Sequence, residues 1–138
     1  MGKYSELKAK HQKEVDAFPF GFAFNTKQFN EMMEKWGLTP DDTDKIYSIG
    51  GGGYVRKSDS EAMDKMFKRH ALERKMARKY GDEYLFEMFA YELANHEYCI
   101  THDLTDTLEA LDLTIEQINA DPKMADALKR AIAAQEDM

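Results

Sequence analysis

The sequence predicts a mainly α-helical protein, a single compact domain with a small β-hairpin or an extended glycine-rich loop. Three observations lead to this prediction. The chain has 138 residues, a length typical of one domain. Apolar residues recur every three or four positions along most of it, which is the spacing of one face of a helix. The stretch 45–57 differs, because β-branched and aromatic residues flank four consecutive glycines there.

Two helices are predicted before the glycine run. The first covers residues 5–18, and Pro19 ends it because proline cannot continue a helix. The aromatic segment PFGFAF then connects it to the second helix, residues 27–36, for which Asn25 or the next residue provides the N-cap. The run 45–57 follows as the hairpin or loop.

Five more helices are predicted after the glycine run. Ser58 or Asp59 is expected to cap the first of them, and Gly81 separates it from the second. Pro122 occupies a favourable first-turn position in the last. The expected ranges are 60–80, 82–98, 104–111, 114–119 and 122–135.

Composition excludes several classes of function. The formal net charge is −7, so the chain lacks the concentrated positive charge that binds phosphate backbones. Cys99 is the single cysteine, which rules out an intrachain disulfide and suits a reducing cytoplasm. Neither a signal peptide nor an apolar run near the ~20 residues of a membrane span is present. We therefore expect a cytoplasmic protein that contacts neither nucleic acid nor membrane directly.

Charge is distributed unevenly along the chain. Residues 56–79 carry nine Lys and Arg against four Asp and Glu, whereas residues 80–122 carry eleven Asp and Glu and no Lys or Arg. The two segments could neutralise each other inside the molecule, or the acidic one could meet a basic partner. For the second alternative, the expected contacts are Glu83, Glu87, Asp103, Asp106, Glu109 and Asp112.

The glycine run does not match a phosphate-binding motif. It lacks the lysine and hydroxyl residue of a Walker loop, and its surroundings are helical rather than βαβ. Arg56 lies just before a helix N-terminus, so an anion could bind there. We expect a turn that adapts to a partner, with Gly51, Gly52 and Arg56 as contacts.

Three histidines and one glutamate lie on apolar helix faces. His11, His70 and His96 come from three different helices, and Glu92 precedes His96 by one turn, close enough for a hydrogen bond. If the faces converge, these four side chains could bind zinc or iron, as facing helices do in metal-binding bundles. The other interpretation is that they satisfy one another and nearby backbone, with no cofactor.

Several segments carry a resemblance to a known family. The stretches YSELKAKHQKEVDAFP, DTDKIYSIGGGGYVRKSD, YELANHEYCITHD and TDTLEALDLT are similar to those of short, uncharacterised proteins from phages and mobile elements of gut Firmicutes. The likeness covers almost the whole chain. It implies no catalytic residues, but it implies an accessory protein of the kind that includes anti-CRISPR inhibitors.

Together these features favour a binding protein over an enzyme. The expected function is stoichiometric binding of a host or phage protein through the acidic surface. A basic, nucleic-acid-binding nuclease of a bacterial defence system is the expected partner. The alternative is a metal-binding or metal-dependent helical protein that uses the inward histidines and Glu92.

Overall fold

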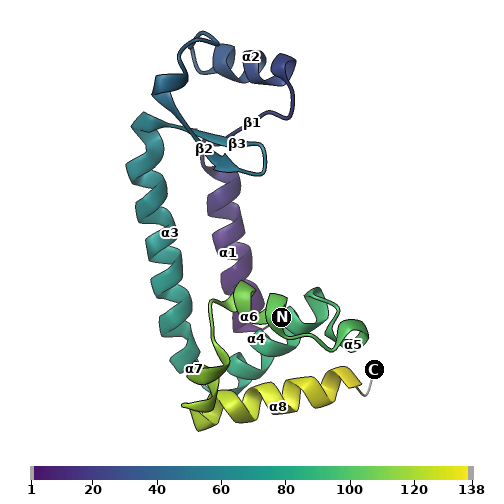
Figure 1. The fold of residues 1–138 in the computed structure, drawn as a ribbon. Coiled ribbons are helices and arrows are strands. Elements are labelled where there is room, and N and C mark those ends of the chain that lie inside the picture. Colours follow the sequence, from purple (N-terminus) through teal and green to yellow (C-terminus); the bar gives the residue numbers. More distant parts are fainter. Residues whose placement is uncertain (1, 137–138) are drawn as a thin grey trace. The chain divides into compact units, whose positions relative to one another are not determined.

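The computed structural model describes residues 2–136 and shows a mainly α-helical fold with a small antiparallel sheet (Figure 1). The predicted fold class is confirmed. In chain order the elements are α1 (Lys3–Ala17), β1 (Gly21–Phe22), α2 (Thr26–Lys35), η1 (Thr43–Lys45), β2 (Ile46–Gly50), β3 (Gly53–Arg56), α3 (Lys57–Ala77), η2 (Arg78–Tyr80), α4 (Asp82–Asn95), α5 (Tyr98–Thr101), α6 (Thr105–Leu111), α7 (Ile115–Asn119) and α8 (Pro122–Glu136).

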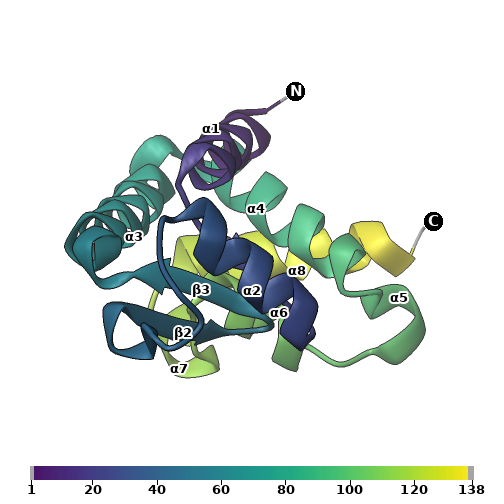
Figure 2. The ribbon, with the colours of Figure 1, turned by 90° about the horizontal axis from the view of Figure 1, so that it is seen from above.

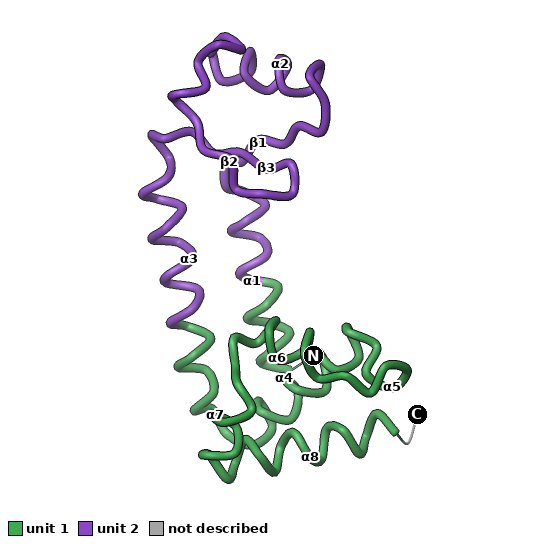
Figure 3. Tube along the Cα trace, in the orientation of Figure 1, with its two compact units in different colours: residues 1–9, 73–138 green, residues 10–72 purple. Residues whose placement is uncertain are grey.

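Contacts divide the chain into two compact units (Figure 3). Unit 1 combines Met1–Ala9 with Glu73–Met138, and unit 2 is Lys10–Leu72. The boundaries fall inside α1 and α3. Whether the chain is a single domain, as the sequence predicts, stays a prediction.

The core of unit 1 lies mainly between α4 and α8. Phe89 and Leu93 of α4 are fully buried, and so are Ala127 and Ala131 of α8. The two alanines are one turn apart on the same helix face, so small side chains let α8 approach α4 closely. Helices α6 and α7 complete this core with Leu111 and Ile118.

Unit 2 is built on a three-stranded antiparallel sheet in the order β1-β3-β2. Helix α2 covers one face of the sheet and buries Met32 and Met33 against Ala23 and Ile46 (Figures 1 and 2). Asn25 caps this helix by accepting a hydrogen bond from the Gln28 amide at 2.8 Å, as predicted. Strand β1 lies in the aromatic segment PFGFAF, for which a connector, extended or not, was predicted.

The glycine run forms the turn of the predicted β-hairpin. Gly50, Gly51 and Gly52 all have positive φ, at 87°, 58° and 78°, which only glycine adopts without strain. The first two have open space around them, whereas the ring of Phe24 covers Gly52. The run is therefore required by backbone geometry.

The helix predicted over 82–98 ends earlier than expected. Helix α4 stops at Asn95, and Glu97 adopts a left-handed conformation with φ of 57° before the short helix α5 begins. The apolar spacing continues across this break, which is why the sequence pattern did not reveal it. Each helix among residues 2–136 is too short or too polar to cross a bilayer.

Candidate functional site

Most of the predicted acidic contacts are exposed in unit 1. Glu83 lies on α4, Asp106 and Glu109 lie on α6, and Asp112 follows α6. None of these four carboxylates forms an ion pair or side-chain hydrogen bond with another residue in the range 2–136. Asp103 is also exposed, but it accepts hydrogen bonds from the Thr105 amide and hydroxyl, which lower the pKa of its carboxyl.

The net charge of the chain comes from the same unit. Unit 1 has sixteen Asp and Glu against nine Lys and Arg, whereas unit 2 has ten of each. The whole formal charge of −7 therefore belongs to unit 1. Among residues 2–136, Glu83, Asp106 and Glu109 form no ion pair with the basic segment, whereas Asp112 interacts electrostatically with Arg78 of that segment.

Glu87 differs from the other predicted contacts because it is half-buried and already engaged. Its carboxylate accepts a hydrogen bond from the Tyr4 amide at 2.7 Å and another from the Ser5 hydroxyl at 2.8 Å. Both donors are in the first turn of α1, where free amides and the helix dipole favour a negative charge. A Cβ on Gly2 would lie 2.4 Å or less from the carboxylate atoms. Glu87 thus caps α1 from α4.

Arg56, another predicted contact, already has partners within the chain. Its Nε donates to Asp59 at 2.8 Å, and its guanidinium lies 5.6 Å from the centre of the Trp36 ring. Asp59 already places a carboxylate in the first turn of α3, where an anion was expected to bind. Gly51 remains exposed at the tip of the hairpin and Gly52 is half-buried.

The four predicted metal ligands form two separate pairs. His11 and His70 stack in unit 2, with ring centres 3.9 Å apart, whereas Glu92 and His96 belong to unit 1. No three His, Cys, Asp or Glu side chains are grouped to hold a metal ion in the part of the chain that the structure describes. The structure therefore gives the zinc or iron alternative no ligand set.

Glu92 is buried, as its position on the apolar face predicts, but its partners differ from those expected. The carboxylate is 1% exposed and accepts a hydrogen bond from the Tyr4 hydroxyl at 2.7 Å. Lys8 Nζ lies 3.4 Å away, whereas His96 Nε2 lies at 3.8 Å, too far for a hydrogen bond. Burial and this contact raise the pKa of Tyr4 far above its usual value. The network joins α1 to α4.

Next to the histidine pair of unit 2 lies an ion pair between Glu14 and Arg69. Glu14 accepts hydrogen bonds from Arg69, one of them at 3.3 Å, and His70 Nε2 lies 3.3 Å from the same carboxylate. The Arg69 hydrogen bonds, with a smaller contribution from His70, lower the pKa of Glu14 to about 2. These contacts join α1 to α3 within unit 2.

Replacing Glu14 by glutamine is expected to remove an acid-sensitive part of the stability. The native pKa of Glu14 is lowered, so its contribution is fully present above the unfolded value of 4.5 and is lost as pH falls toward about 2. The urea midpoints of the unmodified protein and of the Glu14→Gln variant should therefore differ most at neutral pH. This difference should become smaller below about pH 4.5. Glu34→Gln, an exposed change in the same unit, is the control. A gap that widens on acidification would contradict the assignment.

Unit 2 also exposes apolar side chains that sequence reasoning did not identify. Phe22 and Phe24 are 61% and 75% exposed, and Tyr47 and Ile49 on β2 are also exposed. An open groove of about 460 Å³ lies between β1 and α2. The signal was the alternation in PFGFAF, where the small residues point inward and the aromatic ones outward.

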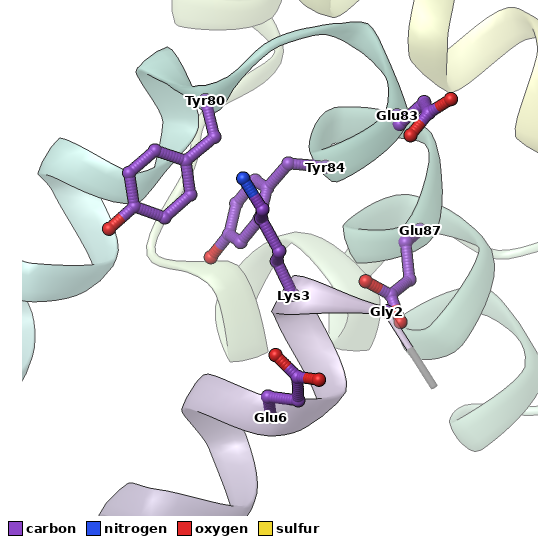
Figure 4. Close-up of a pocket in the computed structure, with 7 residues that line it drawn as sticks. All are labelled: Gly2, Lys3, Glu6, Tyr80, Glu83, Tyr84 and Glu87. Carbon is purple, nitrogen blue, oxygen red and sulfur yellow. The ribbon is translucent and has the colours of Figure 1, made fainter.

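Unit 1 also contains an open pocket of about 630 Å³ (Figure 4). Helix α1 contributes Lys3 and Glu6, and η2 contributes Tyr80. The remaining residues are Gly2 and the α4 side chains Glu83, Tyr84 and Glu87. Carboxylates outnumber cations three to one in this lining, and two tyrosine rings meet edge to face at 5.7 Å.

These features define a small, mainly α-helical protein with an acidic, tyrosine-containing pocket. The chain belongs to DUF7659, a family of unknown function whose model matches residues 3–134. No curated protein matches the chain, and no solved structure matches it. The family assignment specifies no activity, so the function has to be argued from charge and geometry.

Proposed function

We propose that this protein binds a basic protein partner stoichiometrically through the acidic surface of unit 1, formed by Glu83, Asp103, Asp106, Glu109 and Asp112. The observation that carries the proposal is the location of the net charge. All of the formal −7 belongs to unit 1, and Glu83, Asp106 and Glu109 form no ion pair within residues 2–136, while Asp112 interacts electrostatically with Arg78. Unpaired carboxylates of one sign accelerate association with a positively charged surface and disfavour other partners.

A nucleic-acid-binding nuclease is the partner class we propose, encountered in the cytoplasm. Such an enzyme exposes the positive surface that neutralises phosphates, and an acidic protein can compete for that surface. The accessory role follows from the resemblance to phage and mobile-element proteins, among which anti-CRISPR inhibitors act by such contacts. In this mechanism the chain carries out no chemistry and inhibits by occupying the surface.

Neutralising three acidic residues is expected to weaken binding of the partner about tenfold. The variant combines Asp106→Asn, Glu109→Gln and Asp112→Asn, each of which loses an exposed charge that contributes roughly 0.5 kcal/mol to binding. Asn suits position 112 because that residue has positive φ. Affinity for a nuclease purified from the host should be measured by calorimetry at low and at physiological salt. The affinity of the unmodified protein should fall as salt rises.

The matched control removes three charges from unit 2. Glu31→Gln, Glu34→Gln and Asp44→Asn change residues that are exposed and form no ion pair among the described residues. Equal weakening by both triple variants, or binding that is insensitive to salt, would overturn the acidic-surface mechanism. Nuclease inhibition should saturate at a one-to-one ratio. Inactivation of a molar excess of nuclease would show an enzyme instead.

A further inference from the structure

The acidic pocket of unit 1 has the residues of a cation-binding site. Tyr80 is 62% exposed and presents its ring at the pocket, where Lys3 Nζ lies 5.1 Å from the ring centre. A positive charge at this distance from an aromatic face is attracted by the ring quadrupole. The protein thus already places one of its own cations where a ligand cation would bind (Figure 4).

Tyr84 brings a second tyrosine side chain to the pocket. The residue is 3% exposed, lines the pocket, and makes no hydrogen bond through its hydroxyl to another residue among 2–136. Figure 4 shows the hydroxyl end of the ring pointing away from α4 and toward Tyr80. Burial raises the pKa of Tyr84 to about 12, so the hydroxyl stays neutral at physiological pH. A hydroxyl without a partner among the described residues is free to bond with a ligand that enters the pocket.

The carboxylates set the charge of the ligand. Glu6 and Glu83 line the pocket and form no ion pair within the described residues, while Glu87 is committed to the first turn of α1. Arg74 and Arg78 act on Tyr84 electrostatically, but neither of them lines the pocket. An anion would meet three negative charges here, whereas a planar cation could stack on Tyr80 and donate hydrogen bonds to the carboxylates.

We propose that this pocket binds an arginine side chain of the partner protein, whose guanidinium displaces Lys3 from the Tyr80 ring. The inference rests on the proposed function for the origin of that arginine. A guanidinium suits the lining because it is flat, always charged, and has five N–H donors. Its N–H donors match the carboxylate and hydroxyl acceptors of the lining, and its flat face matches the Tyr80 ring.

The site can be tested with a small probe in the absence of any partner. The full chain would be titrated with N-acetyl-arginine amide and observed by NMR. N-acetyl-citrulline amide, which has nearly the same shape without the charge, is the matched control. We expect saturable shifts of the Tyr80 and Tyr84 resonances with the arginine probe, with Kd on the order of 1–10 mM. Absence of such shifts, or equal shifts with citrulline, would overturn the proposal.

Two variants of opposite sign sharpen the test. The double variant Glu6→Gln/Glu83→Gln should bind the arginine probe about fivefold more weakly. Lys3→Gln removes the cation that competes for the Tyr80 ring, so this variant should bind the arginine probe about two- to fivefold more tightly. The charge-matched controls are Glu116→Gln with Glu136→Gln, and Lys129→Gln, all exposed and outside the pocket. Changes of the same size in these controls would reduce the effect to general electrostatics and overturn the site.

Tyr84→Phe tests the hydroxyl while keeping the ring that fills the core. This variant should bind the arginine probe more weakly. The accompanying change in its free energy of unfolding, measured with urea, should be smaller than the loss of binding free energy. Failure of this site and failure of the proposed function are distinguishable. If the partner binds the Tyr84→Phe and Glu6/Glu83 variants with unchanged affinity, the proposed arginine site is wrong and the proposed function stands. If the arginine probe causes specific shifts but no basic protein partner binds, the arginine site stands and the proposed function is wrong.

Discussion

Replacing Phe89 by alanine is expected to lower the free energy of unfolding of unit 1 by about 3–5 kcal/mol. Phe89 is fully buried on α4, in the cluster that joins this helix to α8. Removing the ring loses the transfer energy of its carbons and leaves a cavity, because the buried side chains of the cluster relax only in part to fill the space. Hydrogen exchange of the α4 and α8 amides, together with urea unfolding, would measure the loss.

Phe22→Ala is the matched control for this prediction. The same ring is 61% exposed in unit 2, and its removal should change stability by less than about 0.5 kcal/mol. The single tryptophan, Trp36, also belongs to unit 2, so its fluorescence reports on that unit separately. Equal losses for the two phenylalanine variants, or a loss below about 1 kcal/mol for Phe89→Ala, would show that the α4–α8 core is not the main source of stability in unit 1.

The helices were predictable because their signals are local. The last helix was expected over 122–135 and is Pro122–Glu136, with the proline in its first turn. Thr114 was expected to begin a short helix, and it does so with a capping box to Gln117. These signals reside in a few neighbouring residues, which a sequence shows directly.

Strand β1 and the divided core depend on contacts distant in sequence. A strand of two residues, Gly21–Phe22, exists because β3 pairs with it more than thirty positions away. The small residues Gly21 and Ala23 are buried, whereas Phe22 between them is exposed. Alternation reveals that one set of residues faces inward but does not say which set when the small residues are the ones that pack against α2.

The candidate site shows the same limit. Glu83 and Glu87 lie one turn apart on the same helix, and no local sequence pattern distinguishes them. Glu87 is engaged because α1 begins beside it, an arrangement that links residues 82 or more positions apart. The tyrosine pocket was missed because Lys3 and Glu6 come from one end of the chain and Tyr80 from its middle. The sequence shows that acidic and basic residues are segregated along the chain, but it does not show which side chains each acidic residue contacts.

Replacing Glu92 by alanine is expected to lower the free energy of unfolding by about 2–3 kcal/mol. The carboxylate is 1% exposed and accepts a 2.7 Å hydrogen bond from the hydroxyl of Tyr4, which is itself buried. Without it that hydroxyl has no partner and cannot reach water. Lys8 contributes less to the cost, because its side chain is 46% exposed and can be hydrated when the carboxylate is removed.

Double-mutant cycles separate the two partners of Glu92. The coupling between Glu92→Ala and Tyr4→Phe should be about 1.5–3 kcal/mol, and that between Glu92→Ala and Lys8→Met below about 1 kcal/mol. Alkaline titration adds an independent measurement. The pKa of Tyr4 is raised in the folded state, so its contribution is complete below the unfolded value of 10.0 and is lost as pH rises above it. Tyr4→Phe should flatten this alkaline loss. A larger coupling with Lys8 than with Tyr4 would mean that the ion pair, rather than the buried hydroxyl, holds α1 against α4.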